Sequence, residues 1–134
     1  MNTDAHRLNE LTHKVIGCAY KVGNVLGCGF REKVYENAMV HEFRKAGLKV
    51  EPQKQFTIYY DGAIVGEYCA DIVVEDLVII EIKAVKAFDE VHSAQCLNYL
   101  LATGLPVCLL INFGRTKVDV KRFAGKGLNE LDLT

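Results

Sequence analysis

The chain has 134 residues, enough for one compact domain (residues 1–134) with a single hydrophobic core. Half of the residues are hydrophobic and a quarter are charged, as in an ordinary globular protein. The net charge of −1 gives no overall basic field, so nucleic acid could be contacted only through a local patch. No apolar run approaches the ~20 residues that a membrane-spanning helix needs, and no membrane partner is expected.

The cysteines and the first residues indicate a cellular compartment. The cysteines are odd in number and include no Cys-x-x-Cys pair, so we expect their thiols to be reduced and mostly buried. They are Cys18, Cys28, Cys69, Cys96 and Cys108. The first residues lack the charged-then-apolar pattern of a signal peptide. Both features favour a cytoplasmic protein.

Two helices are expected first. Apolar residues at three- and four-residue steps predict a helix that starts at Thr3 or Asp4 and runs to about Val22. The glycine-rich run 23–29 should break it, either as a helix–helix joint or, less often, as a phosphate cradle. A second helix is expected from about Phe30 to Ala46, with Gly47 as its stop.

The remaining elements predict a mixed sheet. Strands are expected at 55–61, 63–74, 77–85, 107–113 and 118–123, with a helix at 89–103 between the third and fourth strands and a polar tail after Gly125. Asp61-Gly62 is a strong hairpin signal, and Gly66 should bend the second strand. A helix that joins two strands of one sheet allows those strands to lie parallel. The order α-α-β-β-β-α-β-β therefore predicts an α/β sandwich.

Charged residues interrupt the apolar strand 77–85. Alternation places Glu81 and Lys83 on one face with Ile79. A three-residue turn at 75–77 would set Asp71 opposite Glu81 and Cys69 opposite Lys83, whereas a two-residue turn would separate the two carboxylates. Adjacent carboxylates repel unless a cation lies between them, so this pair predicts a Mg²⁺ or Mn²⁺ site. An ordinary surface Glu–Lys pair is the alternative.

Two helices add polar side chains. His92, Gln95 and Tyr99 share one face of the helix 89–103, a pattern that is usually a solvated face. Glu32 lies at the edge of the buried stripe of the second helix. It is either a first-turn glutamate favoured by the helix dipole or a residue that reaches the predicted site.

The motifs resemble a known nuclease family. Asp71, Glu81 and Lys83 look like the active-site motif of the PD-(D/E)XK nuclease superfamily. Gln95 and Tyr99 resemble the QxxxY motif of its RecB-like branch. Gly29, Glu32 and Tyr35 match the signature of the small, mostly bacterial GxxExxY family within that superfamily. The resemblance runs from about Leu11 to Phe123.

The resemblance implies a restriction-endonuclease-like core, a central mixed sheet flanked by helices. It implies that Asp71, Glu81 and Glu32 are catalytic and hold the metal ion, and that Lys83 is the catalytic lysine. The substrate-positioning residues would be Gln95, Tyr99, His92 and Tyr35. The substrate would be nucleic acid, with DNA favoured over RNA, and a second copy of the chain would help such a small domain to grip a duplex.

The chain also departs from the family pattern. Ala70 precedes Asp71 where the superfamily name has proline. Cys69 stands where similar proteins often carry arginine, so we expect one phosphate contact of the family pattern to be missing. Candidate local contacts to nucleic acid are Arg31, Lys33, Lys54, Lys86 and Arg115, although a solvated surface side chain is the more common explanation for any one of them.

Three functions are compatible with this pattern. The first is a metal-dependent nuclease. The second is a catalytically silent module that binds nucleic acid or protein and retains the nuclease fold, because fold does not fix function. The third is a phosphohydrolase that acts on short nucleotides.

Overall fold

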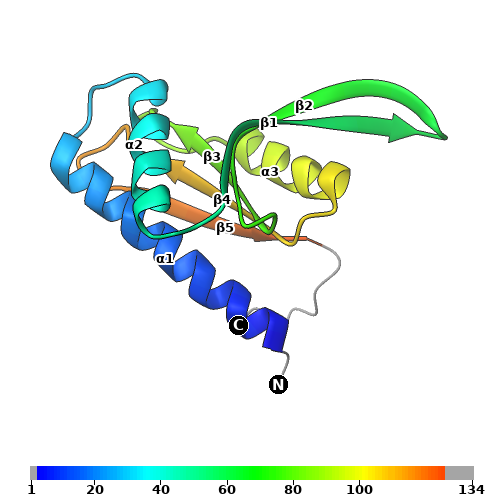
Figure 1. The fold of residues 1–134 in the computed structure, drawn as a ribbon. Helices are drawn as coiled ribbons and strands as arrows, with labels where there is room; N and C mark the ends of the chain where they lie inside the picture. The colour runs from blue at the N-terminus through cyan, green and yellow to red at the C-terminus, as the bar shows by residue number, and fades with distance from the viewer. Residues whose placement is uncertain (1–2, 126–134) are drawn as a thin grey trace.

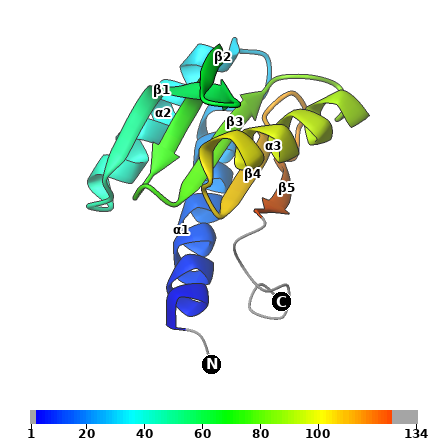
Figure 2. The same ribbon diagram turned by 90° about the vertical axis from the view of Figure 1, so that its right-hand side faces the viewer.

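Three layers make up the fold in the computed structural model, which describes residues 3–125. Two helices cover one face of a central sheet and a third covers the other (Figures 1 and 2). The polar tail after Gly125 lies outside the described residues. None of the described helices combines the length and the apolar character that a membrane span requires.

The helices are α1 (Thr3–Leu26), α2 (Glu32–Lys45) and α3 (Glu90–Thr103). The expected end of α1 near Val22 was wrong, because Gly23 is accommodated inside the helix. A Cβ at Gly23 would lie 2.3 Å from Cγ2 of Val118, so the glycine permits a close approach to the chain before the last strand. The helix ends instead before Gly27, whose φ of 69° suits a C-terminal cap. Only the second half of the glycine run, from Gly27 on, therefore belongs to the connection between α1 and α2.

The strands are β1 (Val50–Tyr60), β2 (Ala63–Val74), β3 (Val78–Lys83), β4 (Val107–Asn112) and β5 (Asp119–Ala124), in the spatial order β1-β2-β3-β4-β5. β3 and β4 are parallel and the other neighbours are antiparallel, which confirms the predicted element order and mixed sheet. β1 begins five positions before the expected start at Gln55. It includes Pro52, which an edge strand tolerates.

The β1–β2 hairpin extends well beyond the rest of the sheet (Figure 1). Asp61 and Gly62 turn it with φ values of 52° and 77°, the left-handed geometry of a type I′ turn, as predicted. The register shifts between Ile58 and Tyr59, and Ile58 pairs with Gly66, so the pairing becomes irregular at the glycine where a bend was expected.

The β2–β3 turn has the three-residue form on which the predicted site depends. Val74 pairs with Val78, and the pairing continues to Ile72 and Ile80. The pairing ends there, so Cys69 does not pair with Lys83, which differs from the expectation. Asp71 and Glu81 lie one position beyond the last pair, at the point where β2 leaves β3.

Two hydrophobic clusters hold the layers together. The larger lies between the sheet and α1 and α2, and the smaller lies between the sheet and α3. All six residues of β4 are buried, as expected for a central strand. All five cysteines are free, but only Cys96 and Cys108 are buried, so the expectation of mostly buried thiols was too broad.

Candidate active site

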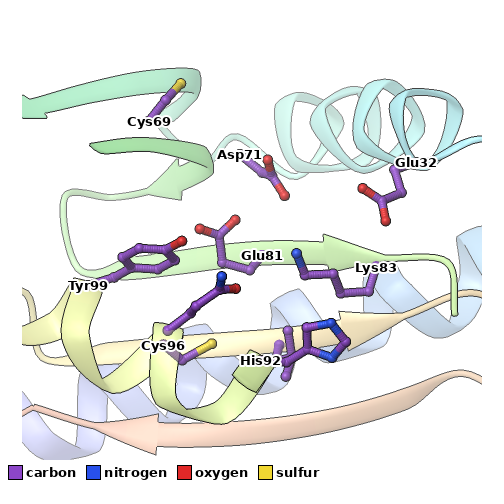
Figure 3. A pocket seen from close by; sticks show the side chains of 10 residues that line it. Glu32, Cys69, Asp71, Glu81, Lys83, His92, Cys96 and Tyr99 are labelled. Carbon is purple, nitrogen blue, oxygen red and sulfur yellow. The ribbon is translucent and has the colours of Figure 1, made fainter. Parts of the chain in front are cut away.

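A polar pocket of about 160 Å³ lies where β2 separates from β3, between α2 and α3 (Figure 3). It is lined by Glu32, Cys69, Asp71, Glu81, Lys83, His92, Gln95, Cys96, Tyr99 and Leu110. All but one of the residues expected at the site therefore meet in one cavity. They come from four separate elements of the chain.

Asp71 and Glu81 face each other across this pocket (Figure 3). Oδ2 of Asp71 accepts a hydrogen bond of 2.8 Å from the backbone N–H of Ile82, so the carboxylate takes the place of the strand pairing that ends at Ile72. Glu81 is 7% exposed, and its Oε1 accepts a hydrogen bond from the Tyr68 hydroxyl. Each carboxylate is thus held by one donor.

The surroundings of Glu81 disfavour its charged form. Burial, together with the charge of Asp71, raises the pKa of the Glu81 carboxyl to about 9, although the hydrogen bond from Tyr68 lowers it. Burial also raises the pKa of Tyr68, which therefore stays a hydrogen-bond donor. A carboxyl in this state would be stabilised in its ionised form by a cation placed between it and Asp71.

Lys83 and Glu32 form the end of the pocket nearest α2. The amine of Lys83 points into the same space as the carboxylates of Asp71 and Glu81 (Figure 3). Oε2 of Glu32 accepts a hydrogen bond of 3.1 Å from the N–H of Ala84, directly after β3. Glu32 therefore joins α2 to the strand that carries Glu81 and Lys83.

The α3 wall holds the remaining expected residues. Asp89 caps the helix through Val91 N–H, and Nδ1 of His92 accepts a 3.1 Å hydrogen bond from Asp89 N–H, so His92 both caps α3 and lines the pocket. The ring of Tyr99 stacks on Tyr68 with 3.7 Å between centroids. Gln95 lines the same wall. The polar face of α3 is thus turned to the pocket.

Tyr35 lies in the hydrophobic core and does not line the pocket. It is fully buried and its ring stacks on Phe113. Its hydroxyl donates to the carbonyl of Gly27 at 2.6 Å and accepts from the N–H of Phe30 at 3.2 Å. Because it ties down the loop before Glu32, its position fits a structural role in place of the substrate contact expected from the motif.

Two functional neighbours were not expected from the sequence. Tyr68 donates to Glu81, and buried Asn112 fixes the chain after β3 by bonding both N–H and carbonyl of Val85, at 3.0 and 2.8 Å. A polar residue in the otherwise apolar run 107–113 is the signal that could have pointed to Asn112. Strand alternation predicted that Tyr68 lies on the opposite face of β2 from Asp71 and therefore away from the site.

No three His, Cys, Asp or Glu side chains within residues 3–125 are grouped to hold one ion. The acidic donors at the pocket are the Asp71–Glu81 pair and Glu32 opposite Lys83. A divalent ion on the pair would take its other ligands from water and substrate oxygens, which is usual for Mg²⁺.

Comparisons with known proteins concern the family and the fold of this chain. The family model of the PD-(D/E)XK nuclease superfamily matches residues 9–123. A solved structure, "Crystal structure of SSO0001", superposes with a TM-score of 0.56 at 13% sequence identity, over 76% of this chain and 54% of that chain. This chain thus spans about half of that one, and the likeness concerns the fold. No curated protein matches.

Proposed function

The chain belongs to the PD-(D/E)XK nuclease superfamily, and on this premise we propose that it is a metal-dependent nuclease that hydrolyses phosphodiester bonds in nucleic acid, with DNA favoured over RNA. The observation that carries the proposal is the facing pair of Asp71 and Glu81, with the Lys83 amine directed into the same pocket. Two facing carboxylates can hold a metal ion that assists phosphodiester hydrolysis, and a nearby amine can neutralise charge on the phosphate.

The donor set fits a hard divalent cation, Mg²⁺ or Mn²⁺. Asp71 and Glu81 offer carboxylate oxygens, and no soft ligand except the thiols of Cys69 and Cys96 lines the pocket. When bound, the ion would polarise a phosphate oxygen and lower the pKa of a water. Glu32 would contribute through a water, since among the described residues it is not grouped with Asp71 and Glu81 closely enough for the three to hold one ion.

The other pocket residues would handle the substrate and the proton. Lys83 would orient the attacking water or neutralise charge that develops on the phosphate. Gln95 and Tyr99 on the α3 wall would position the strand being cut, and His92 would join them from the first turn of α3.

Within the superfamily we propose that the chain belongs to the GxxExxY branch. The three signature residues have distinct physical tasks that support this placement. Gly29 adopts a φ of 113°, Glu32 lines the pocket, and Tyr35 holds the intervening loop through Gly27 and Phe30. A signature built in this way would deliver one acidic side chain to the site.

A cleavage screen tests the proposal. End-labelled DNA and RNA, single- and double-stranded, are incubated with the protein in Mn²⁺, in Mg²⁺ and in EDTA. We expect cleavage of a polymer in Mn²⁺ or Mg²⁺ and none in EDTA. Asp71→Asn should reduce the rate by about 10²-fold or more, because it removes a carboxylate ligand of the metal ion that would stabilise charge at the reacting phosphate.

The screen also separates the alternatives. Binding of nucleic acid without cleavage under any of these conditions would favour the catalytically silent module. Short nucleotides are assayed under the same conditions, and their turnover in place of the polymers would favour the phosphohydrolase. Cleavage that survives Asp71→Asn unchanged would assign the activity to another site or to a contaminant.

A further inference from the structure

A second groove, of about 550 Å³, lies between α2 and β1 beside the candidate active site. It is lined by Lys33, Glu36, Asn37, Val40, His41, Arg44, Pro52 and Gln53. The nuclease motifs account for none of these residues. The groove is more than three times as large as the pocket around Asp71.

The groove adjoins the active-site pocket at two places, one on α2 and one on the sheet. Glu32 and Lys33 are consecutive residues of α2, and the first lines the pocket while the second lines the groove. On the sheet side, the thiol of Cys69 in the pocket donates to Oε1 of Gln53 in the groove at 3.2 Å. The pocket and the groove are therefore neighbouring hollows, bounded by adjacent residues.

A buried carboxylate organises the groove. The side chain of Glu36 is only 5% exposed, and it accepts hydrogen bonds of 2.6 Å from both the Lys33 amine and the Gln53 amide. Gln53 has a φ of 52°, a strained geometry for a non-glycine residue, and its neighbours Pro52 and Lys54 pair with the residues on either side of Asp71. Two rim side chains are thus held in place before any ligand arrives.

The rim of the groove has the chemistry of a nucleic-acid site. Lys33, Asn37, His41 and Arg44 fall at steps of four, four and three residues along α2, so they form one stripe. The stripe spans about 16 Å at about 1.5 Å per residue, the length of a few nucleotides. Arg44 is exposed, and no carboxylate in the described part of the chain forms an ion pair with it.

The groove also has features that a site for phosphate alone would not need. Val40 and Pro52 offer an apolar surface, while Asn37 offers an amide group that can bond a base edge. Bases must be unstacked to reach such a surface, which is the state of a single strand.

We propose that the groove between α2 and β1 binds the nucleotides next to the scissile phosphate on one single strand, with Arg44 and Lys33 contacting phosphates and Asn37 contacting a base. This inference deepens the proposed function and rests on its assignment of nucleic acid as the substrate. It supplies phosphate contacts on the side of the site where Cys69 stands.

The test measures binding separately from cleavage. A fluorescein-labelled, mixed-sequence DNA single strand of about 12 nucleotides, within the ~4–16-nucleotide range of such sites, is titrated with protein in EDTA, and anisotropy is recorded at several salt concentrations. The same strand in a duplex is titrated in parallel. The variants are Arg44→Gln and Asn37→Ala, which alter exposed side chains and leave buried Glu36 with its partners.

Lys45→Gln is the matched control. Lys45 neighbours Arg44 but pairs with Glu42, which also binds Lys21 of α1, so it faces away from the groove. Arg44→Gln should weaken single-strand binding several-fold and reduce the slope of log affinity against log salt by about 0.7, the value for one phosphate contact. Asn37→Ala should weaken binding with no change of slope. Lys45→Gln should bind like the wild type.

The outcomes distinguish this inference from the nuclease proposal. Groove variants that bind the single strand like the wild type would overturn the groove assignment, whether or not the protein cleaves. Equal losses for single strand and duplex, or no single-strand binding by the wild type at low salt, would also overturn it. Binding that depends on Arg44 and Asn37 without any cleavage in Mn²⁺ would support the groove assignment and contradict the nuclease proposal.

Discussion

The Tyr68 hydroxyl donates a hydrogen bond to Glu81, the more deeply buried carboxylate of the candidate active site. Tyr68 is itself stacked on Phe56 and Tyr99, so the donor is fixed by aromatic packing. The bond lowers the pKa of a carboxyl that burial and Asp71 raise. Tyr68 thus helps Glu81 to reach the ionised form that a cation needs.

Tyr68→Phe removes this donor and keeps the ring. We expect a loss of about 1–3 kcal/mol in unfolding free energy, because a buried acceptor loses its partner. The pKa of Glu81 should rise further, so Mn²⁺ affinity at pH 7 should fall about 10-fold, as for loss of a group that supports a metal ligand. Thermal unfolding and Mn²⁺ titration measure the two effects. Unchanged Mn²⁺ affinity would contradict the role assigned to Tyr68.

Glu81→Gln tests the electrostatic cost of the carboxylate pair. A carboxyl whose pKa rises from 4.5 to about 9 on folding stabilises the fold below pH ~4.5, and this contribution is lost as the pH rises toward 9. In EDTA, the melting temperature of Glu81→Gln should therefore equal or exceed that of the wild type at pH 7, and the difference should grow toward pH 9. A variant that is much less stable at every pH would indicate a structural ion pair of Glu81.

Lys83→Met should separate metal binding from hydrolysis. The substitution keeps the length of the side chain and removes its charge, so Mn²⁺ affinity should be unchanged or higher. Cleavage should fall by about 10²–10⁴-fold, the usual contribution of a positioned acid–base group. A parallel loss of Mn²⁺ binding and cleavage would show that Lys83 acts on the fold of the pocket and not on the reaction.

Tyr35→Phe tests the structural reading of the signature tyrosine. The hydroxyl bonds the carbonyl of Gly27 and the N–H of Phe30, so its removal should cost about 1 kcal/mol and lower the melting temperature by a few degrees. Tyr60→Phe is the control, because that side chain is 74% exposed at the hairpin tip. Equal melting temperatures for the two variants would refute the loop contact.

The order and type of every element were predictable because local signals agreed with the tertiary structure. Asp61-Gly62 predicted a hairpin, and the apolar run 107–113 predicted a central strand. The end of α1 was not predictable, because the role of Gly23 depends on Val118, a residue distant in the chain. From the sequence alone, such a glycine is interpreted as the end of a helix, because its packing partner is not known.

The site was predictable to the extent that strand alternation holds. The three-residue turn after Val74 brought Asp71 and Glu81 together as expected. Tyr68 was missed because alternation reverses where β2 leaves β3. Ile72 and Val74 face α1 and α2, whereas Ala70 and Tyr68 face α3, although all four have even numbers. The groove beside α2 was missed because its residues meet only when β1 packs on the helix.

Calorimetric titration of Mn²⁺ into the wild type and into Asp71→Asn tests the central claim most directly, because it requires no assumption about the substrate. At pH 7, the account predicts binding to the wild type with release of a proton, since Glu81 with a pKa of about 9 must ionise to take part. Two buffers with different ionisation enthalpies reveal that proton. Binding should be lost in Asp71→Asn. Equal Mn²⁺ affinity in the two proteins would contradict a metal site built on Asp71 and Glu81.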